Sequence, residues 1–142
     1  MSTCIFFGNR TATSDLSEKI ISKIKYLINE KGVNLFYVGN HGNFDKIVMQ
    51  CLIEVKKQYE NIDYAIVLAY MPKKELDYTD KTIFPEGQES VLPKYAINKR
   101  NKWMLKNADY LITYVSHPGN SALLREEALK KGICVIDILD SD

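Results

Sequence analysis

The sequence predicts an α/β protein with a doubly wound parallel sheet of about five strands, formed as a single domain over residues 1–142. Five short apolar runs are continuous rather than alternating, as in strands that are buried on both faces of a sheet. Segments with helical periodicity lie between these runs, and such alternation with right-handed crossovers gives an open parallel sheet. The sequence has no internal repeat, low-complexity tract or linker that would divide it.

The five expected strands are rich in Ile, Val, Phe and Tyr, which suits a sheet covered by helices on both faces. They are Cys4–Phe7, Leu35–Val38, Ala65–Ala69, Tyr110–Val115 and Ile133–Leu139. The three cysteines, Cys4, Cys51 and Cys134, are odd in number, far apart and set within apolar runs, so neither a disulfide framework nor a zinc site is indicated. We expect them to pack in the core as small hydrophobic residues.

The first two expected helices have clear apolar stripes. Between Leu16 and Ile28, apolar residues recur at three- and four-residue steps. Asp15 and Glu18 have the spacing of a capping box at its start, and Gly32 is a suitable C-terminal stop. A second stripe runs from Phe44 to Val55 and predicts the helix that follows the second strand.

Two further helices are expected in the second half of the chain. The third covers about 94–107, directly after Pro93. The fourth covers about 120–131, with Asn120 or Ser121 as its cap and Gly132 at its end. Between the third strand and the third helix, Met71 to Lys94 has no usable periodicity. A stretch of this length in a compact domain forms either a lid or binding loop or a solvated surface excursion.

The charge balance restricts the classes of partner. Lys and Arg number 19 and Asp and Glu number 18, so the formal net charge is 19 − 18 = +1. This disfavours nucleic-acid binding by a broad basic surface. No apolar run has the roughly 20 residues needed to cross a bilayer, and the N-terminus does not have the pattern of a signal peptide. We therefore expect a cytoplasmic protein that does not enter a membrane.

The turns that follow four of the strands carry the residues that indicate a ligand. In doubly wound sheets, ligands bind beyond the carboxyl ends of the strands, where the strand order reverses. Glycine lets the backbone approach a phosphate, and the free N–H groups of a helix start attract its charge. The pattern is neither G-x-G-x-x-G nor a P-loop, which disfavours an ordinary dinucleotide or NTPase site. The expected ligand-binding residues are Gly8, Asn9, Arg10, Gly39, Asn40, His41, Gly42, Asn43, Tyr70, Met71, His117, Gly119, Asn120 and Ser121.

Arg100 stands out on the third helix because it shares a face with Ala96, Trp103 and Met104, which should meet the sheet. A guanidinium placed there needs an anion or a carboxylate to offset its desolvation. The alternative is a structural ion pair with the side-chain stem packed on Trp103. On the fourth helix, alignment with Ala122 and Leu129 predicts Glu126 as the inward-facing carboxylate.

The two histidines, His41 and His117, both follow strands and are able to share one site as acid and base. The alternative is that each only donates a hydrogen bond within its own loop. No third ligand has a matching spacing, so neither a metal nor a cofactor is expected.

Four segments resemble the SLOG superfamily, a Rossmann-like group that includes Lonely-guy phosphoribohydrolases, DprA-type proteins and signal-nucleotide sensors. The similarity is to a branch of small bacterial proteins and covers nearly the whole chain. It is carried by Phe6–Arg10, Phe36–Asp45, Ala69–Pro72 and Arg100–Met104.

Within that group, the similarity to Lonely-guy enzymes is only partial. The motifs of these enzymes are matched at Arg100, Met104, Ala108–Asp109, Pro118–Gly119 and Glu126. Two glycines and a threonine of their phosphate loop are replaced in this chain by Asn120, Ala122 and Leu123. The resemblance implies a homodimer, and it implies roles for Arg100 and Glu126 in cleaving the N-glycosidic bond of a nucleoside monophosphate.

Three functions follow from these observations. The first is binding of a small nucleotide-derived ligand, of ADP-ribose type or a nucleoside phosphate, with the segment from Tyr70 to Lys94 over the base. The alternative is a phosphoribohydrolase-like N-glycosidase that uses Arg100 and Glu126. A DprA-like nucleic-acid binder is disfavoured by the +1 charge.

Overall fold

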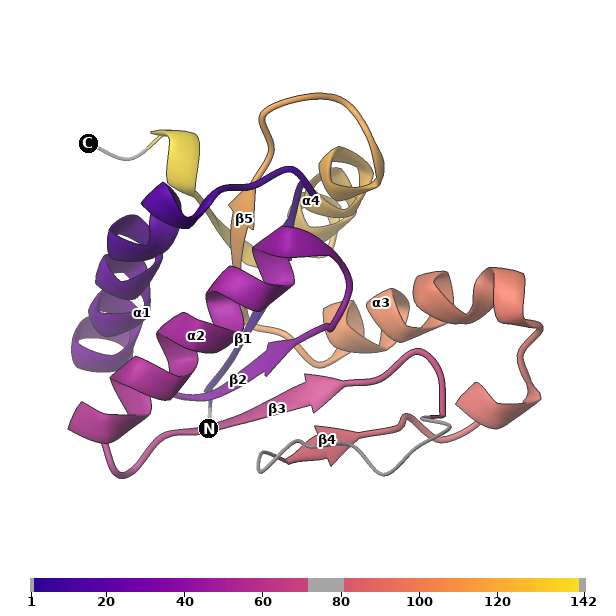
Figure 1. Cartoon of the computed structure of the whole chain (residues 1–142), viewed down its shortest axis with the longest axis horizontal. Coiled ribbons are helices and arrows are strands. Elements are labelled where there is room, and N and C mark those ends of the chain that lie inside the picture. The colour runs from indigo at the N-terminus through magenta and orange to yellow at the C-terminus, as the bar shows by residue number, and fades with distance from the viewer. Residues whose placement is uncertain (1, 72–80, 141–142) are drawn as a thin grey trace.

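A computed structural model describes residues 2–71 and 81–140, so positions 72–80 of the segment Met71 to Lys94, expected as a lid or a surface excursion, lie outside the described residues (Figure 1). The α/β fold is confirmed, with a single parallel sheet in the order β4-β3-β2-β1-β5-β6. Its strands are β1 (Ser2–Gly8), β2 (Val33–Val38), β3 (Asp63–Val67), β4 (Thr82–Ile83), β5 (Tyr110–Tyr114) and β6 (Cys134–Asp137). All five expected strands are present, and the short β4 is additional.

The helices cover both faces of the sheet (Figure 1). Helices α1 (Ser17–Lys31) and α2 (Gly42–Gln58) pack together on one face, and α3 (Ala96–Lys106) and α4 (Asn120–Lys130) cover the other. The central strand shows why its apolar run is continuous: Cys4 and Phe6 enter the first core, and Ile5 and Phe7 enter the second. Short 3-10 turns occupy Ser14–Leu16, Gln88–Ser90, Pro93–Tyr95 and Ile138–Asp140.

The predicted helix ends are confirmed in part. Gly32 ends α1 with a left-handed φ of 67°. The capping box is wrong, because a 3-10 turn precedes α1 and the hydroxyl of Thr13 donates to Asp15 instead. The predicted cap of α4 is also wrong, since Gly119 occupies that position and Asn120 and Ser121 are the first residues of the helix.

Part of the 71–94 segment is folded against the sheet. Strand β4 pairs with β3, and the side-chain amide of buried Gln88 donates to the carbonyls of Ala69 at 3.0 Å and Ala96 at 2.6 Å. Residues 81–94 are therefore anchored at β4 and Gln88, while Glu86, Glu89 and Leu92 between and beyond these anchors are exposed, as in a surface segment. A strand of two residues is too short to produce a periodic pattern, which explains why the sequence did not reveal it.

The cysteine prediction is correct for two of the three residues. Cys4 and Cys51 are buried, and burial raises the pKa of Cys51 to about 11 and that of Cys4 further. Cys134 is exposed, because it begins β6 at the edge of the sheet. The prediction of core packing is therefore wrong for Cys134.

The strand order reverses at β1. The chain adds β2, β3 and β4 on one side of β1, and then returns to place β5 and β6 on the other side. Crevices for ligands form at this reversal, beyond the carboxyl ends of the strands. The fold therefore brings the turns that follow β1, β2 and β5 to one edge of the sheet.

Candidate functional site

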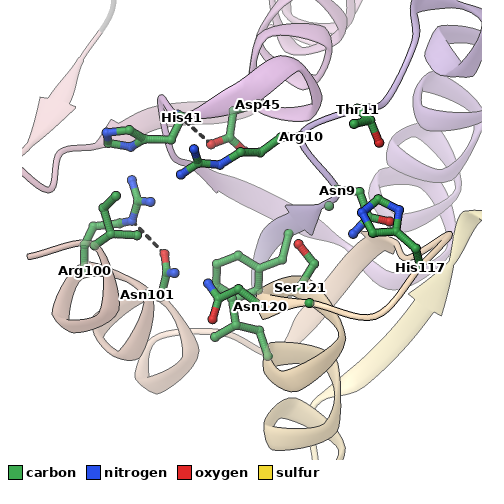
Figure 2. A pocket seen from close by; sticks show the side chains of 15 residues that line it. Asn9, Arg10, Thr11, His41, Asp45, Arg100, Asn101, His117, Asn120 and Ser121 are labelled. Atoms are coloured by element: carbon green, nitrogen blue, oxygen red, sulfur yellow. Dashed lines mark hydrogen bonds between the residues drawn. The ribbon is translucent and has the colours of Figure 1, made fainter. Parts of the chain in front are cut away.

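A cavity of about 270 Å³ opens at this edge, between the ends of β1, β2 and β5 and the helices α3 and α4 (Figure 2). Four separate segments of the chain contribute its walls. The lining residues are Phe7, Gly8, Asn9, Arg10, Thr11, His41, Asp45, Ile97, Arg100, Asn101, His117, Gly119, Asn120, Ser121 and Leu124.

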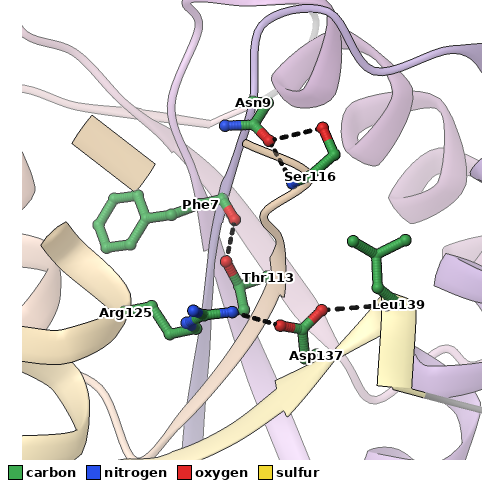
Figure 3. Close-up of polar contacts among 7 residues, drawn as sticks. All are labelled: Phe7, Asn9, Thr113, Ser116, Arg125, Asp137 and Leu139. Atoms are coloured by element: carbon green, nitrogen blue, oxygen red, sulfur yellow. Dashed lines mark hydrogen bonds and ion pairs between the residues drawn. The ribbon is translucent and has the colours of Figure 1, made fainter. Parts of the chain in front are cut away.

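The floor of the cavity is fixed by contacts between β1 and β5. The backbone N–H of buried Asn9 donates to the carbonyl of Tyr114 at 3.0 Å. Its side-chain Oδ1 accepts from the backbone N–H of Ser116 at 2.6 Å and from the Ser116 hydroxyl at 3.0 Å (Figure 3). The hydroxyl of Thr113 donates to the carbonyl of Phe7 at 2.6 Å. These bonds hold the two strand ends at a fixed separation, so this end of the cavity is preformed.

Arg100 forms one wall and is only 3 % exposed. Its Nε donates to Oδ1 of Asn101 at 2.8 Å, and its Nη1 donates to the carbonyl of Val67 at 3.0 Å. Burial lowers its pKa, although the nearby Asp45 acts in the opposite direction. The predicted sheet-facing position is confirmed, and the alternative of a structural ion pair is not, because no carboxylate of the described residues lies within 4.0 Å.

Gly39 makes room for this guanidinium. A Cβ atom at Gly39 would lie 2.6 Å from Nη1 of Arg100 and 2.9 Å from Oδ2 of Asp45. Any larger residue would therefore displace one of these groups. Gly39 does not line the cavity itself, but it lets two of the wall residues approach the end of β2.

Asp45 is a cavity residue that sequence reasoning missed. It lies in the first turn of α2, and its Oδ2 accepts a hydrogen bond from the backbone N–H of His41 at 2.9 Å (Figure 2). Burial raises its pKa to about 6, even though the His41 hydrogen bond and the charges of Arg100 and Arg10 act to lower it. The sequence feature that could have indicated Asp45 as a site residue is an acidic side chain in the first turn of a helix that follows a strand.

The two histidines line the same cavity but lie at opposite ends of it (Figure 2). Burial, followed by the charges of Arg100 and Arg10, lowers the pKa of His41, so its ring is neutral at pH 7. Its Nδ1 is buried without a hydrogen-bond partner among the described residues. The exposed His117 ring places Nδ1 3.1 Å from the Ser116 hydroxyl.

The start of α4 faces the cavity without a cap. Gly119 provides no side chain, and the first turn contains no acidic residue. Among the described residues, no acceptor meets the backbone N–H groups of Asn120, Ser121 and Ala122. These groups and the helix dipole favour an anion at this end of the cavity.

Several expected ligand-binding residues surround the cavity without lining it. Gly42 has φ +87°, and a Cβ there would lie 2.7 Å from Cγ of Arg10. The N–H of Asn43 donates to the carbonyl of Arg10 at 3.3 Å. Tyr70 is 44 % exposed, and its ring meets that of His41 edge-on with centroids 5.9 Å apart. Asn40 and Met71 are exposed and do not line the cavity.

Glu126 does not reach the cavity, so its predicted inward orientation is wrong. It is exposed and lines a separate open depression with Lys23, Arg125 and Asp137. The residues that α4 buries are Leu124 and Ala128, and a helix turns about 200° over two residues, so Glu126 points away from both. Sequence reasoning also missed the lining residues Phe7, Thr11, Ile97, Asn101 and Leu124.

No protein-family model matches the sequence, and no curated protein matches it. Among the described residues, no three His, Cys, Asp or Glu side chains are grouped so that they could hold a metal ion. In the same part of the chain, no helix has the length and apolar character needed to span a membrane. The function is therefore argued from the geometry of the cavity.

Proposed function

We propose that this protein binds a small phosphate-bearing, nucleotide-derived ligand, of ADP-ribose type or a nucleoside phosphate, in the cavity at the carboxyl edge of the sheet. The observation that carries the proposal is the buried guanidinium of Arg100 on one wall of a cavity that the uncapped start of α4 also faces. Both features favour an anion.

Burying the charged guanidinium of Arg100 has an energetic cost. Arginine stays protonated at physiological pH, and removing it from water is costly unless an opposite charge or full hydrogen bonding offsets the loss. Arg100 donates through Nε and Nη1 to neutral oxygens, and no carboxylate of the described residues lies within 4.0 Å of its guanidinium. A phosphate would supply the missing negative charge and accept from the remaining N–H groups.

The size and charge of the site favour a small ligand over a polymer. The cavity of about 270 Å³ lies near the lower end of the volumes of small-molecule sites. Two arginines, Arg10 and Arg100, line it in a chain whose net charge is only +1. One locally held anion fits this distribution better than a nucleic-acid strand does.

The base would lie at the end of the cavity near His41. The neutral ring of His41 and the half-exposed ring of Tyr70 are in contact there, and together they offer an aromatic surface. Aromatic faces stack on nucleobases of any sequence. The alternative N-glycosidase built on Arg100 and Glu126 has no such support, because Glu126 does not line this cavity.

The thermal unfolding midpoint tests the proposal. The ligands are AMP, GMP, CMP, UMP and ADP-ribose at millimolar concentration, and a ligand at 100 times its Kd stabilises the folded state by about 2.7 kcal/mol. Arg10→Ala and Arg100→Ala should remove most of that shift. Arg10 is exposed, so its variant separates loss of binding from loss of folding.

Lys102→Ala provides the matched control, because it removes an exposed charge from the same helix as Arg100 and should keep the full shift. If none of the five nucleotides shifts the unfolding midpoint of the unaltered protein, the proposed ligand class is wrong.

Two further predictions belong to the same proposal: a cytoplasmic location, which the sequence pattern favours, and a homodimer, which the resemblance to the SLOG superfamily implies. Light scattering of the purified protein tests the second part. A mass that corresponds to one chain at all concentrations would contradict the dimer.

A further inference from the structure

A second hollow lies on the outer side of α3 and shares no lining residue with the cavity at the ends of the strands. It is an open groove of about 590 Å³ between α3 and the segment that precedes this helix. We call it the lysine groove, and the lining residues that the argument uses are Glu86, Tyr95, Lys99, Lys102, Trp103 and Lys106.

The segment that forms the other side of the lysine groove is held in place. The side-chain amide of buried Gln88 ties it to the carbonyl of Ala69, beyond β3, and to that of Ala96, in α3. Nζ of Lys99 donates to the carbonyl of Gly87 at 3.3 Å, where the backbone has a left-handed φ of 85°. The groove is therefore formed before any partner binds, which lowers the cost of ordering on binding.

Three lysines give the groove its charge. Lys99, Lys102 and Lys106 are spaced by three and four residues, so they form a row on one face of α3. All three are exposed, and none of them forms an ion pair with a carboxylate of the described residues. With Glu86 as the acidic residue of the lining, the groove carries a formal charge of +2 in a chain whose net charge is +1.

Two aromatic rings give the same groove an apolar surface. Trp103 is half-buried, and its ring contacts that of Tyr37 with centroids 5.3 Å apart. Tyr95 lies in the turn before α3 and is 52 % exposed. Aromatic side chains at the surface are common anchors in protein–protein binding. The groove therefore offers apolar contact beside a row of unpaired positive charge.

We propose that the lysine groove binds an acidic segment of a partner protein, in which carboxylates alternate with apolar side chains. The carboxylates would pair with the lysine row, and the apolar side chains would cover Tyr95 and Trp103. Charge complementarity of this kind speeds association and selects the partner. This binding is separate from that of the nucleotide and does not depend on it.

The spacing of the lysines fits a segment in extended conformation. A helix rises by about 1.5 Å per residue, so Lys99 and Lys106 lie about 10 Å apart along α3. In an extended chain, every second side chain lies on the same side, at intervals of about 6.6 Å. A segment with an acidic residue at every second position therefore places two or three carboxylates along the row.

A nucleic-acid strand fits the lysine groove less well. Proteins that bind single strands combine stacking rings with a basic groove that follows the phosphates over several nucleotides. The row of lysines extends over only about 10 Å, and Glu86 lies in the same groove. The charge of the groove therefore suits a short acidic segment rather than a polymer.

Fluorescence anisotropy of labelled peptides with the purified full chain tests the proposal. The probe is a peptide of about eight residues in which Glu alternates with Leu. Two comparison peptides replace every Glu by Gln or every Leu by Ser, and a labelled oligothymidylate represents nucleic acid. We expect the Glu-Leu peptide to bind at least about 10-fold more tightly than either comparison peptide, with an affinity that falls as salt is added.

Two variants change the charge and the apolar surface separately. Lys106→Glu should weaken binding of the Glu-Leu peptide by at least about 10-fold, and Tyr95→Ala should weaken it by about 5-fold. Both side chains are exposed, and the thermal unfolding midpoint checks that the variants fold. Lys19→Glu is the matched control, because it makes the same change of charge at an exposed position of α1, on the other face of the sheet.

Each remaining outcome counts against the proposal. Equal binding of the Gln-Leu peptide, an equal loss in Lys19→Glu and Lys106→Glu, or no saturation by the Glu-Leu peptide up to about 1 mM would overturn it. Tighter binding of the oligothymidylate, lost in Lys106→Glu, would assign the groove to nucleic acid instead. Lys106→Glu should keep the nucleotide-induced shift of the unfolding midpoint, so failure of one proposal is distinguishable from failure of the other.

Discussion

Two helices begin at the same edge of the sheet, and the N–H groups at their starts are satisfied to different extents. At the start of α2, the Asp45 carboxyl accepts the His41 N–H, and the Asn43 N–H donates to the Arg10 carbonyl. At the start of α4, Gly119 supplies no cap, and the first N–H groups have no acceptor among the described residues. Two N–H groups at the start of α2 have acceptors within the protein, whereas those of the first turn of α4 have none among the described residues, and we call these two ends the closed start and the open start.

Because of this difference, the two helix starts contribute different groups to the cavity wall. The closed start of α2 brings Asp45 and His41 to the wall as titratable groups, and the N–H groups of His41 and Asn43 already have acceptors within the protein. The N–H groups at the open start of α4 have no acceptor among the described residues and are available for the anion that we propose. Variants that change one helix start at a time allow a change in stability or in anion affinity to be attributed to that start.

The largest expected effect comes from Asp45→Asn at the closed start. The pKa of Asp45 rises from 3.8 to about 6 on folding, so the folded state prefers the protonated form. The contribution to stability is fully present below pH 3.8 and is lost as the pH rises through 6, which amounts to about 3 kcal/mol. At pH 7.5 we expect Asp45→Asn to be more stable than the unaltered protein by up to that amount.

Urea unfolding at several pH values measures this difference. The gain in free energy of unfolding should shrink toward zero as the pH falls from 6 to 3.8, because the unaltered carboxyl then becomes neutral as well. An equal difference at pH 7.5 and pH 4 would show that Asp45 does not ionise in the folded protein as described.

Gly39→Ala should crowd the closed start. The new Cβ would lie 2.6 Å from Arg100 Nη1 and 2.9 Å from Asp45 Oδ2, so at least one of these groups must move. We expect a loss of about 1–3 kcal/mol in the free energy of unfolding, together with weaker nucleotide binding. Gly32→Ala is the control, because it introduces backbone strain at φ 67° with nothing within 4 Å of the new atom, and it should leave binding unaltered.

Ser121→Asp should close the open start. A carboxylate in the first turn of α4 interacts favourably with the helix dipole, worth about 0.3–1 kcal/mol of stability. The same charge repels a phosphate, so the nucleotide-induced shift of the unfolding midpoint should disappear. Ser121→Asn has a similar shape without the charge and should keep most of that shift. Undiminished nucleotide binding by Ser121→Asp would place the anion elsewhere in the cavity.

The smallest effect is expected from Glu126→Gln, which alters neither helix start. The side chain is exposed on the outer face of α4, and surface substitutions of this kind change stability by less than about 0.5 kcal/mol. Nucleotide binding, measured by the unfolding midpoint, should match that of the unaltered protein. A loss of binding would mean that this carboxylate acts on the cavity from outside.

The sequence predicts the fold better than it predicts the helix ends. A strand buried on both faces needs an unbroken apolar run, and the split of β1 between two cores shows this directly at Phe6 and Phe7. Helix starts are less predictable, because Asp15 accepts from nearby Thr13 in place of the predicted capping box, and Gln88 binds a carbonyl 19 residues away. Strand β4 depends on such contacts and has only two residues.

The site was predictable where a side chain's position follows from its place after a strand or on a helix face. Arg100 was found because the face it shares with Ala96 and Met104 is buried by the sheet. Glu126 was misplaced because the stripe of α4 is narrow, with only Leu124 and Ala128 buried. Asp45 was missed because its importance depends on Arg10 and Arg100, which are far away in the sequence and reach it only after folding.

The hydrogen bonds between Asn9 and Ser116 join residues 107 positions apart, and this spacing has a consequence for how the protein is made. During synthesis the N-terminal strands and the α1–α2 layer leave the ribosome well before β5 is available to pair with β1. Contacts of such long range form late, since the loop between them must first be closed. A nascent chain would therefore acquire the closed start of α2 early and could hold a nucleotide only once its last quarter has been translated.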